Sequence, residues 1–480
     1  MDGLSGDLQQ FPQEYRMEGG SMERAAMAAV EEAKKRCSAL TQRIIHSEKL
    51  SNLSSKTTLL KLIQSELSFL HRLSHPFPSS PLSVNIGHLE AVVHVLQQPF
   101  VTGVSRVCKP IVLSPSKRIY VDIVCSLNGN PVWFVVSDRN PRYIFWDRNE
   151  GLKTRIRLLL EAANESPVTL RPSSIIFFFA NGLDDGDSQK FRDEFGATKL
   201  ELESFSYEEL ELEEDWTSVN LIGRSFPKSC VLQIRVETDG FGMNDKHLLD
   251  SAGKDILSSC KKHIESCGSN LGTSFCSLVS GLKCCCCPLD MYTGLEEGLS
   301  KELFDGIGAK LVNFDTTAMI AIVSGISNGG TEKLLAKPES ELRGRFKGNY
   351  EFVIAQVNSE IQNPIHGELA GVISGKIGII CESVHSEFEE LISMCGGPNE
   401  ISRANHFLKF LKVVPDCAST RLMNLPTTRK MALKNKVVFG TGDYWHAPTV
   451  TANMAFVRAV SQTGMSLFVV EHRPRALIGD

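Results

Sequence analysis

The sequence lacks any apolar run long enough to cross a membrane. Its densest apolar segments are SIIFFFA at residues 174–180 and VWFVVS at 132–137, well short of the ~18 residues that a spanning helix needs. The first 20 residues, MDGLSGDLQQFPQEYRMEGG, have neither the apolar stretch of a signal peptide nor the arginine-rich character of a transit peptide. We therefore expect a cytoplasmic or nuclear protein with no membrane association.

A strong net charge and a regular cysteine framework are also missing. The net charge of -5 argues against a protein that coats nucleic acid without specificity. The 14 cysteines do not have the spacing of a small secreted disulfide scaffold. Four of them are adjacent, Cys284 to Cys287, and only the outer two have a CxxC separation, so zinc, oxidation and acylation are all weak alternatives there.

What remains is an ordinary globular composition, with 42% hydrophobic and 22% charged residues. A length of 480 residues predicts two or three domains. We divide the chain into a flexible tail (1–21), an N-terminal helical hairpin with a mixed α/β domain (22–225), a linker region with a helix and a Cys-rich loop (226–300), and a C-terminal domain (301–480). The predicted fold class is α/β.

Two amphipathic stripes open the N-terminal domain. The first runs through Ala26, Val30, Ala33, Cys37, Leu40 and Ile44, and the second through Leu59, Ile63, Leu67 and Leu70. The polar break SNLSS at 51–55 separates them, which predicts an antiparallel helical hairpin that packs on its own domain. A partner-binding coiled coil is the alternative, but fewer than about three uninterrupted heptads are present.

Strand signals follow the hairpin. IYVDIVCSL (119–127) and VWFVVSD (132–138) flank NGNP, and Asn-Gly between apolar runs predicts a β-hairpin. We expect a helix over 144–164 and a buried strand within 172–182. Residues 199–216 contain eight carboxylates and one lysine, which indicates a solvated edge or loop, with recruitment of a basic partner as the alternative.

After a strand at 231–237, a helix around 246–266 and the Cys-rich loop, the last 180 residues alternate short apolar strands with helices. This rhythm predicts a mainly parallel sheet covered by helices on both faces. The expected strands include LVNF (311–314), GIIC (378–381), KVVF (436–439) and SLFVV (466–470).

An acid follows each of these four strands. Asp315 comes after LVNF, Glu382 after GIIC, Asp443 in the GTGD turn after KVVF, and Glu471 after SLFVV. Ligands of parallel α/β sheets gather at the carboxyl ends of the strands, and clustered carboxylates suit Mg²⁺ or Mn²⁺. Asp315 alone is also a good helix N-cap.

The order strand, Asp-Thr-Thr, helix, and later strand, Glu, acidic helix, resembles the PIN domain, whose active members are metal-dependent ribonucleases. More closely, FDTTAMIAIVSGISNG (314–329), VVFGTGDYWHAPTVTANMAFVRA (437–459) and HRPRAL (472–477) resemble the C-terminal PIN-like domain of a eukaryotic family of unknown function. In that family a mixed α/β domain of unknown function comes first, similar here to residues 119–141.

The resemblance implies a metal site. Asp315 matches the first PIN acid and Glu382 the second, while Asn453 occupies the third position, where a carboxylate is expected. Asp443 is the candidate to replace that carboxylate, and Glu471 takes the fourth position. If the site is active, these residues hold Mg²⁺ or Mn²⁺, and a bound water attacks a phosphodiester.

Basic and aromatic residues suggest single-stranded RNA as the partner. From Arg403 to Lys436 there are eight basic residues and one acid, and we select Arg429, Lys430, Lys434, Lys436 and, after the last strand, Arg473 as phosphate contacts. Tyr444 and Trp445 are candidates to stack on bases, with a buried aromatic plug as the alternative for Trp445. These basic residues are also typical of a solvated surface.

Two functions therefore stand at this stage. The preferred one is a metal-dependent ribonuclease or a nuclease-derived RNA-binding protein. The alternative is a catalytically inactive PIN-like scaffold that recruits protein partners, through the N-terminal domain or the acidic stretch.

Overall fold

The computed structural model describes residues 13–51, 53–73, 84–114, 117–147, 151–200, 226–236, 271–283 and 310–480. The acidic stretch beyond Leu200, the predicted helix at 246–266 and Cys284 to Cys287 lie outside these ranges, as do residues 1–12. The first helix begins at Gln13, so part of the segment that we predicted as a tail is helical.

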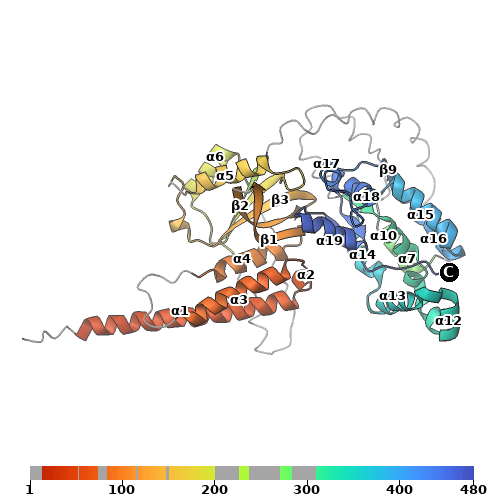
Figure 1. The fold of residues 1–480 in the computed structure, drawn as a ribbon, viewed down its shortest axis with the longest axis horizontal. Helices are drawn as coiled ribbons and strands as arrows, with labels where there is room; N and C mark the ends of the chain where they lie inside the picture. The colour runs from red at the N-terminus through yellow and green to blue at the C-terminus, as the bar shows by residue number, and fades with distance from the viewer. Residues whose placement is uncertain are drawn as a thin grey trace, which may run out of the picture.

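The N-terminal helical hairpin is confirmed. Helices α1 (Gln13–His46) and α3 (Lys56–Arg72) pack along each other, with the short α2 (Glu48–Ser51) between them in the chain (Figure 1). Predicted apolar positions form the core between them, and the buried ones are Val30, Ala33, Cys37, Leu40, Ile44, Leu59, Ile63 and Leu70. A third helix, α4 (Ile86–Gln97), packs against both helices of the hairpin.

Sheet A follows the hairpin and has the strand order β1-β2-β3-β4-β6-β5. Its strands are β1 (Val101–Ser114), β2 (Lys117–Leu127), β3 (Asn130–Ser137), β4 (Ser174–Phe179), β5 (Thr198–Lys199) and β6 (Cys230–Arg235). Only the β3–β4 pair is parallel. The predicted β-hairpin is β2–β3, and its turn residues Asn128 and Gly129 have φ of 48° and 86°, as a type I′ turn requires.

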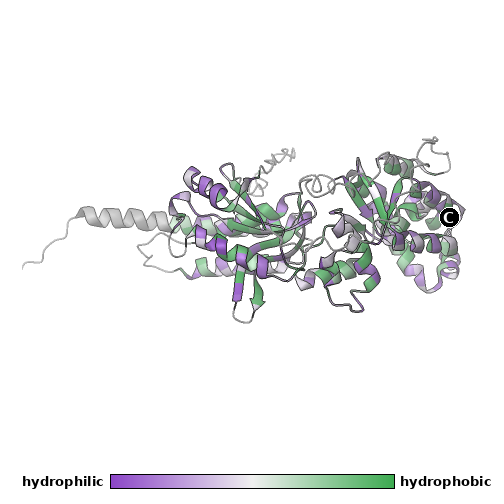
Figure 2. Ribbon diagram, turned by 90° about the horizontal axis from the view of Figure 1, so that it is seen from above, coloured by the Kyte–Doolittle hydropathy of each residue, from purple (hydrophilic) through white to green (hydrophobic). Residues whose placement is uncertain are grey.

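Helices cover both faces of sheet A, so this part of the chain has three layers (Figure 1). The hairpin and α4 cover one face, and α5 (Leu152–Glu165) with α6 (Asp185–Phe195) covers the other. Hydrophobic residues are concentrated in the strands and on the helix faces that meet them (Figure 2). Helix α5 starts later than the predicted residue 144, because Trp146 packs on Phe191 and donates a hydrogen bond to Glu194.

Sheet B lies in the C-terminal part and is parallel throughout, in the order β11-β10-β7-β8-β9. The strands are β7 (Leu311–Phe314), β8 (Ile377–Cys381), β9 (Leu411–Val414), β10 (Thr449–Thr451) and β11 (Val469–Glu471). All five carboxyl ends meet at one side, which we call the carboxyl edge, and the starts of the strands form the amino edge. The predicted parallel sheet is thus confirmed.

The helices around sheet B complete this fold. They are α7 (Thr273–Ser280), α10 (Thr316–Val323), α11 (Thr331–Leu335), α12 (Glu339–Phe346), α13 (Tyr350–Gln362), α14 (Ile365–Ile373), α15 (Glu382–Cys395), α16 (Pro398–Leu408), α17 (Thr420–Met423), α18 (Leu433–Tyr444) and α19 (Met454–Thr463). None of the helices in the described ranges has the length and apolar character that a bilayer crossing requires.

One predicted strand is wrong. Residues 436–443 belong to helix α18, and the strand comes later, as β10. The apolar Val438 and Phe439 join the core under the helix. Gly442 lets the helix approach the sheet, since a Cβ there would lie 2.2 Å from the Thr449 hydroxyl. Tertiary packing therefore overrides the local β-like pattern.

The two described segments of the predicted linker, residues 226–236 and 271–283, belong to folded parts. Strand β6 lies inside sheet A, and Phe275, Leu278 and Val279 of α7 join the main core of sheet B. We call the residues up to 236 the N-terminal unit, and residues 271–283 with 310–480 the C-terminal unit.

The two units touch through β1 and the end of α19. The Ser105 hydroxyl donates a 2.7 Å hydrogen bond to the Gly464 carbonyl. Gly103 has φ of 53°, and a Cβ there would stand 1.9 Å from the Leu467 carbonyl oxygen, so only glycine fits this close approach.

Candidate nucleic-acid interface at the carboxyl edge of sheet B

Asp315 sits at the centre of the carboxyl edge. It follows β7, the middle strand, and is 4% exposed. Its Oδ1 accepts hydrogen bonds from the Thr317 hydroxyl at 2.7 Å and from the Ala318 N–H at 2.8 Å, and its Oδ2 accepts one from the Thr451 hydroxyl. Burial raises the pKa of Asp315, although these donors oppose the shift. The carboxylate therefore caps α10 and ties β7 to the end of β10.

Three other predicted ligands lie at the same edge by topology. Glu382 opens α15 after β8, Asn453 caps α19 after β10, and Glu471 ends β11. The Asn453 side chain accepts a 3.3 Å bond from the Phe456 N–H, while Glu382 and Glu471 are exposed. The parallel sheet thus places Asp315, Glu382, Asn453 and Glu471 at one edge.

Asp443 does not join them. It lies near the C-terminus of α18, which leads into the start of β10 at the amino edge. There its carboxylate accepts hydrogen bonds from Ser419 at 2.6 Å and from Arg421 at 2.9 Å. The strand predicted over KVVF (436–439) placed Asp443 at the carboxyl edge. Because these residues instead form a helix that leads into the start of β10, its C-terminal end and Asp443 lie at the amino edge.

A metal ion at the carboxyl edge would need free oxygen ligands from these residues. Mg²⁺ needs several oxygen ligands around one point, yet both Asp315 oxygens already accept hydrogen bonds from the protein. Within the described ranges, one group of three His, Cys, Asp or Glu side chains has ligand atoms close enough for one ion, and it lies in the N-terminal unit. The carboxyl edge in this arrangement does not fit Mg²⁺ or Mn²⁺, and we derive no hydrolytic step through such an ion.

The basic residues chosen from the sequence divide into two groups. Arg429, Lys430, Lys434 and Arg473 are exposed; Lys434 forms an ion pair with Glu387, and Arg473 lies 4.0 Å from Glu368. Lys436 is a correction. It is 2% exposed, and its Nζ donates to the carbonyls of Met423 and Leu425, so it fastens a loop to α18.

The two aromatic residues also differ from each other. Trp445 is buried and packs with Leu311, Ile379, Val414 and Ala447, which is the buried plug named as the alternative. Tyr444 is 40% exposed, and its ring meets that of Trp445 edge-on with the centroids 5.5 Å apart. Both follow Asp443 at the amino edge, away from Asp315.

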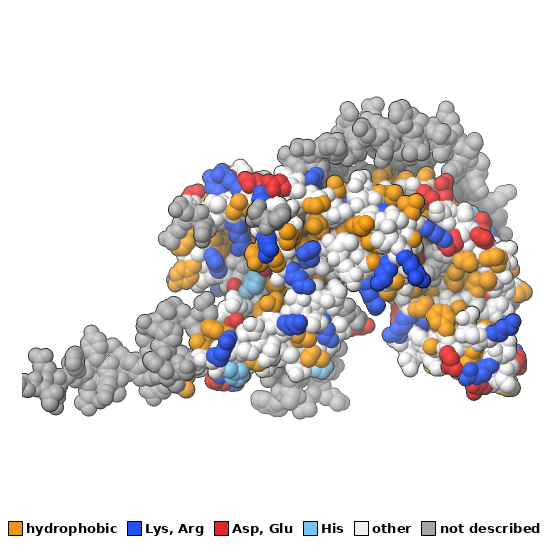
Figure 3. Space-filling view, viewed as in Figure 1, with side chains coloured by type: hydrophobic (Ala, Val, Ile, Leu, Met, Phe, Trp, Pro, Cys, Tyr) orange, Lys and Arg blue, Asp and Glu red, His pale blue; other side chains and the backbone are white. Residues whose placement is uncertain are grey.

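A cleft between the two units is the feature that sequence reasoning missed. It has a volume of about 800 Å³ and runs beside β11, the outermost strand of sheet B, and β1, the outermost strand of sheet A. Four basic side chains line it: Lys49, Arg106, Lys109 and Arg458. Lys and Arg side chains lie on both sides of the hollow between the units (Figure 3).

Glu471 is the acid in the lining of this cleft, so the cleft reaches the carboxyl edge. Although Glu471 is exposed on the whole, desolvation by the cleft walls raises the pKa of its carboxyl, and the positive charge of Arg458 opposes the shift. Lys49 donates a hydrogen bond to the Gln98 carbonyl, and burial lowers its pKa to about 8. The cleft therefore presents a surplus of positive charge to a ligand.

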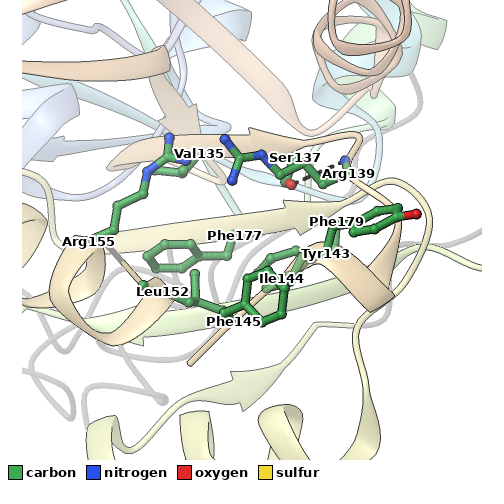
Figure 4. A pocket seen from close by; sticks show the side chains of 11 residues that line it. Val135, Ser137, Arg139, Tyr143, Ile144, Phe145, Leu152, Arg155, Phe177 and Phe179 are labelled. Atoms are coloured by element: carbon green, nitrogen blue, oxygen red, sulfur yellow. Dashed lines mark hydrogen bonds between the residues drawn. The ribbon is translucent and has the colours of Figure 1, made fainter. Parts of the chain in front are cut away.

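A second, smaller pocket lies on sheet A (Figure 4). It has a volume of about 160 Å³ and is lined mainly by apolar side chains, among them Phe145, Leu152 and Phe177. Arg139 and Arg155 extend over its other side (Figure 4). Burial lowers the pKa of Arg155, with Arg139 adding to the shift and Asp122 opposing it. Both arginines come from segments whose pattern gave no signal of a site.

Comparison with known proteins gives two results. No solved structure matches the chain. Residues 312–480, which hold nearly all of sheet B and every predicted site residue, match the family described as "Protein of unknown function (DUF1308)".

Proposed function

We propose that this protein binds single-stranded RNA along the cleft between its two units, and that its C-terminal unit is a PIN-like, nuclease-derived domain used for binding. The observation that carries the proposal is the cleft itself, whose lining has four basic side chains and one acid. A polyanion gains most from such a surface, because each phosphate that is neutralised releases counterions.

The cleft is lined by residues of both units. Its two long walls are β1 with the α2–α3 connection on one side, and α19 with β11 on the other. No aromatic side chain is among the residues that line it, so binding relies on phosphate contacts and not on stacked bases. We therefore expect weak discrimination between base sequences.

Metal-dependent cleavage stays a prediction from the resemblance alone. The four acids that it requires include Asp443, which lies at the amino edge, and the third position is the amide Asn453. A scaffold that recruits protein partners is the remaining alternative, and it requires no RNA in the cleft.

Fluorescence anisotropy with a labelled single-stranded RNA tests the proposal. The double variant Lys109→Gln/Arg458→Gln removes two exposed charges of the cleft. We expect its affinity to fall roughly tenfold, and the slope of log K against log salt to shrink by about 1.4, because each lost phosphate contact changes the slope by about 0.7 for a single strand.

Lys333→Gln/Lys337→Gln is the charge-matched control. Neither lysine lines the cleft; Lys333 is in α11, and Lys337 forms an exposed pair with Glu341. An equal loss of RNA affinity in both double variants would show that only the net charge of the protein matters. If the wild type binds no RNA, the scaffold function is favoured instead. Incubation of the same RNA with the wild-type protein and Mn²⁺ or Mg²⁺ shows whether the RNA is cleaved.

A further inference from the structure

Three side chains of the N-terminal unit converge beside β1 and β2, the first two strands of sheet A. His88 comes from α4, Cys108 from β1 and Asp122 from β2, and their ligand atoms all lie within 4.8 Å of one another. His88 Nε2 stands 3.0 Å from Asp122 Oδ1. Residues 88, 108 and 122 are far apart in the sequence, so this group is created by the fold.

The sheet brings Cys108 and Asp122 to the same point. The flanking pairs Val107–Ile123 and Lys109–Val121 keep their register, so Cys108 stands opposite Asp122. Cys108 has φ of 48°, a left-handed conformation that is rare and costly for a residue other than glycine. The strand thus departs from regular geometry at the residue that supplies the sulfur atom.

Asp122 is held from the other side. The β2–β3 ladder ends at the Ile123–Phe134 pair, and beyond it Asp122 Oδ2 accepts a 2.7 Å hydrogen bond from the Val136 N–H. This bond fixes the carboxylate and leaves Oδ1 directed to His88. A carboxylate oriented in this way by the backbone is typical of the support that metal ligands receive.

We propose that His88, Cys108 and Asp122 bind one Zn²⁺ ion. The set offers one nitrogen, one sulfur and one oxygen, and a thiolate with an imidazole selects zinc over Mg²⁺ or Ca²⁺. In a tetrahedral zinc site the ligand atoms are roughly 3 to 4 Å apart, given bond lengths of about 2.0 to 2.3 Å. The three ligand atoms all lie within 4.8 Å of one another, and His88 Nε2 is 3.0 Å from Asp122 Oδ1, so their spacing is close to that of such a site.

Three protein ligands leave the fourth position to water or to a ligand from solution, as in catalytic zinc sites. The His88 side chain is 28% exposed and that of Asp122 is 16% exposed, so an ion has a path to the site. On binding, the thiol proton of Cys108 leaves to solvent, and so does the Nε2 proton of His88 when the ring is charged; the neutral imidazole that binds the ion keeps its proton on Nδ1.

A nucleophilic Cys–His pair is the competing explanation, and the surroundings of the thiol disfavour it. Burial, together with the charge of Asp122, raises the pKa of Cys108 to about 12. In addition, His88 Nε2 faces Asp122 Oδ1 at 3.0 Å, whereas a nucleophilic cysteine needs a base directed to its thiol and a lowered pKa.

Titration of the metal-free full-length protein with Co²⁺ tests the proposal, because a thiolate ligand gives Co²⁺ a charge-transfer band in the near ultraviolet. We expect one equivalent to bind with that band, and Zn²⁺ to displace it. Cys108→Ser should abolish the band, and His88→Gln should weaken binding at least tenfold.

Two controls separate this site from other thiols. Cys230→Ser changes a cysteine of β6 in the same sheet and should bind Co²⁺ like the wild type. A variant with Cys284 to Cys287 all changed to serine must keep the band as well. The proposal is overturned if the wild type binds no Co²⁺, if Cys108→Ser keeps the band while folded by circular dichroism, or if the four-serine variant loses it.

Discussion

At the scale of single residues, Asp315 has two possible roles. The sequence marks it both as a helix cap and as the first acid of a nuclease-like site. The structure gives its carboxylate three donors, two of them from the helix start and one from Thr451. Its capping role therefore predicts a stability effect that is independent of any chemistry.

We predict that Asp315→Ala lowers the free energy of unfolding by about 1 kcal/mol or more, because the cap of α10 is lost. Asp315→Asn should stay close to the wild type, since asparagine is an equally good cap and the buried site already disfavours the charge. Urea denaturation of the three proteins measures this difference. Equal destabilisation by the two substitutions would contradict the capping account.

Lys49 gives a prediction on pH. Burial lowers its pKa to about 8, so Lys49 is charged at pH 7 and becomes neutral as the pH rises through that value. RNA affinity should therefore fall between pH 7 and pH 9 in the wild type. In Lys49→Gln it should be lower at pH 7 and nearly constant over this range. Parallel pH curves for the two proteins would exclude Lys49 from the interface.

At the scale of elements, the sequence predicts several helices and strands correctly, but it does not predict helix α18. The hairpin α1–α3, the β2–β3 turn and the β7–Asp315–α10 unit follow from local periodicity, Asn-Gly and a capping residue. The segment that forms helix α18 was predicted to contain a strand, because KVVFGTG is rich in β-branched residues and glycine. Its helical state depends on contact with Asn313 and Thr449, which are remote in the sequence.

The account of α18 predicts opposite effects for two Gly→Ala substitutions. In Gly442→Ala the new Cβ would lie 2.2 Å from Thr449 Oγ1 and 2.9 Å from Asn313 Nδ2, so we expect a loss of about 1 to 3 kcal/mol from overpacking. Gly344→Ala in α12 meets nothing within 4 Å and should stabilise by about 0.5 to 1 kcal/mol. Thermal unfolding compares them. If both substitutions stabilise the protein, α18 is not tightly packed against the sheet at Gly442.

At the scale of the whole molecule, the candidate interface arises from the way the two units meet. Arg106 and Arg458 both line the cleft but lie in different units. The units are joined nearby by the Ser105–Gly464 hydrogen bond, whose two residues are 359 positions apart in the sequence. The sequence predicted acids at strand ends and a basic run near residue 430, both from local pattern. It held no local signal for the cleft, because the lining residues share no motif and meet only in the folded chain.

The most direct test of the central claim is photocrosslinking of a single-stranded RNA that carries 4-thiouridine, with the crosslinked peptides identified by mass spectrometry. The account predicts crosslinks in two segments, residues 101–109 of β1 and residues 454–471 from α19 to β11, and their loss in Lys109→Gln/Arg458→Gln. Crosslinks confined to the amino edge around Tyr444, or none in either segment, would contradict it.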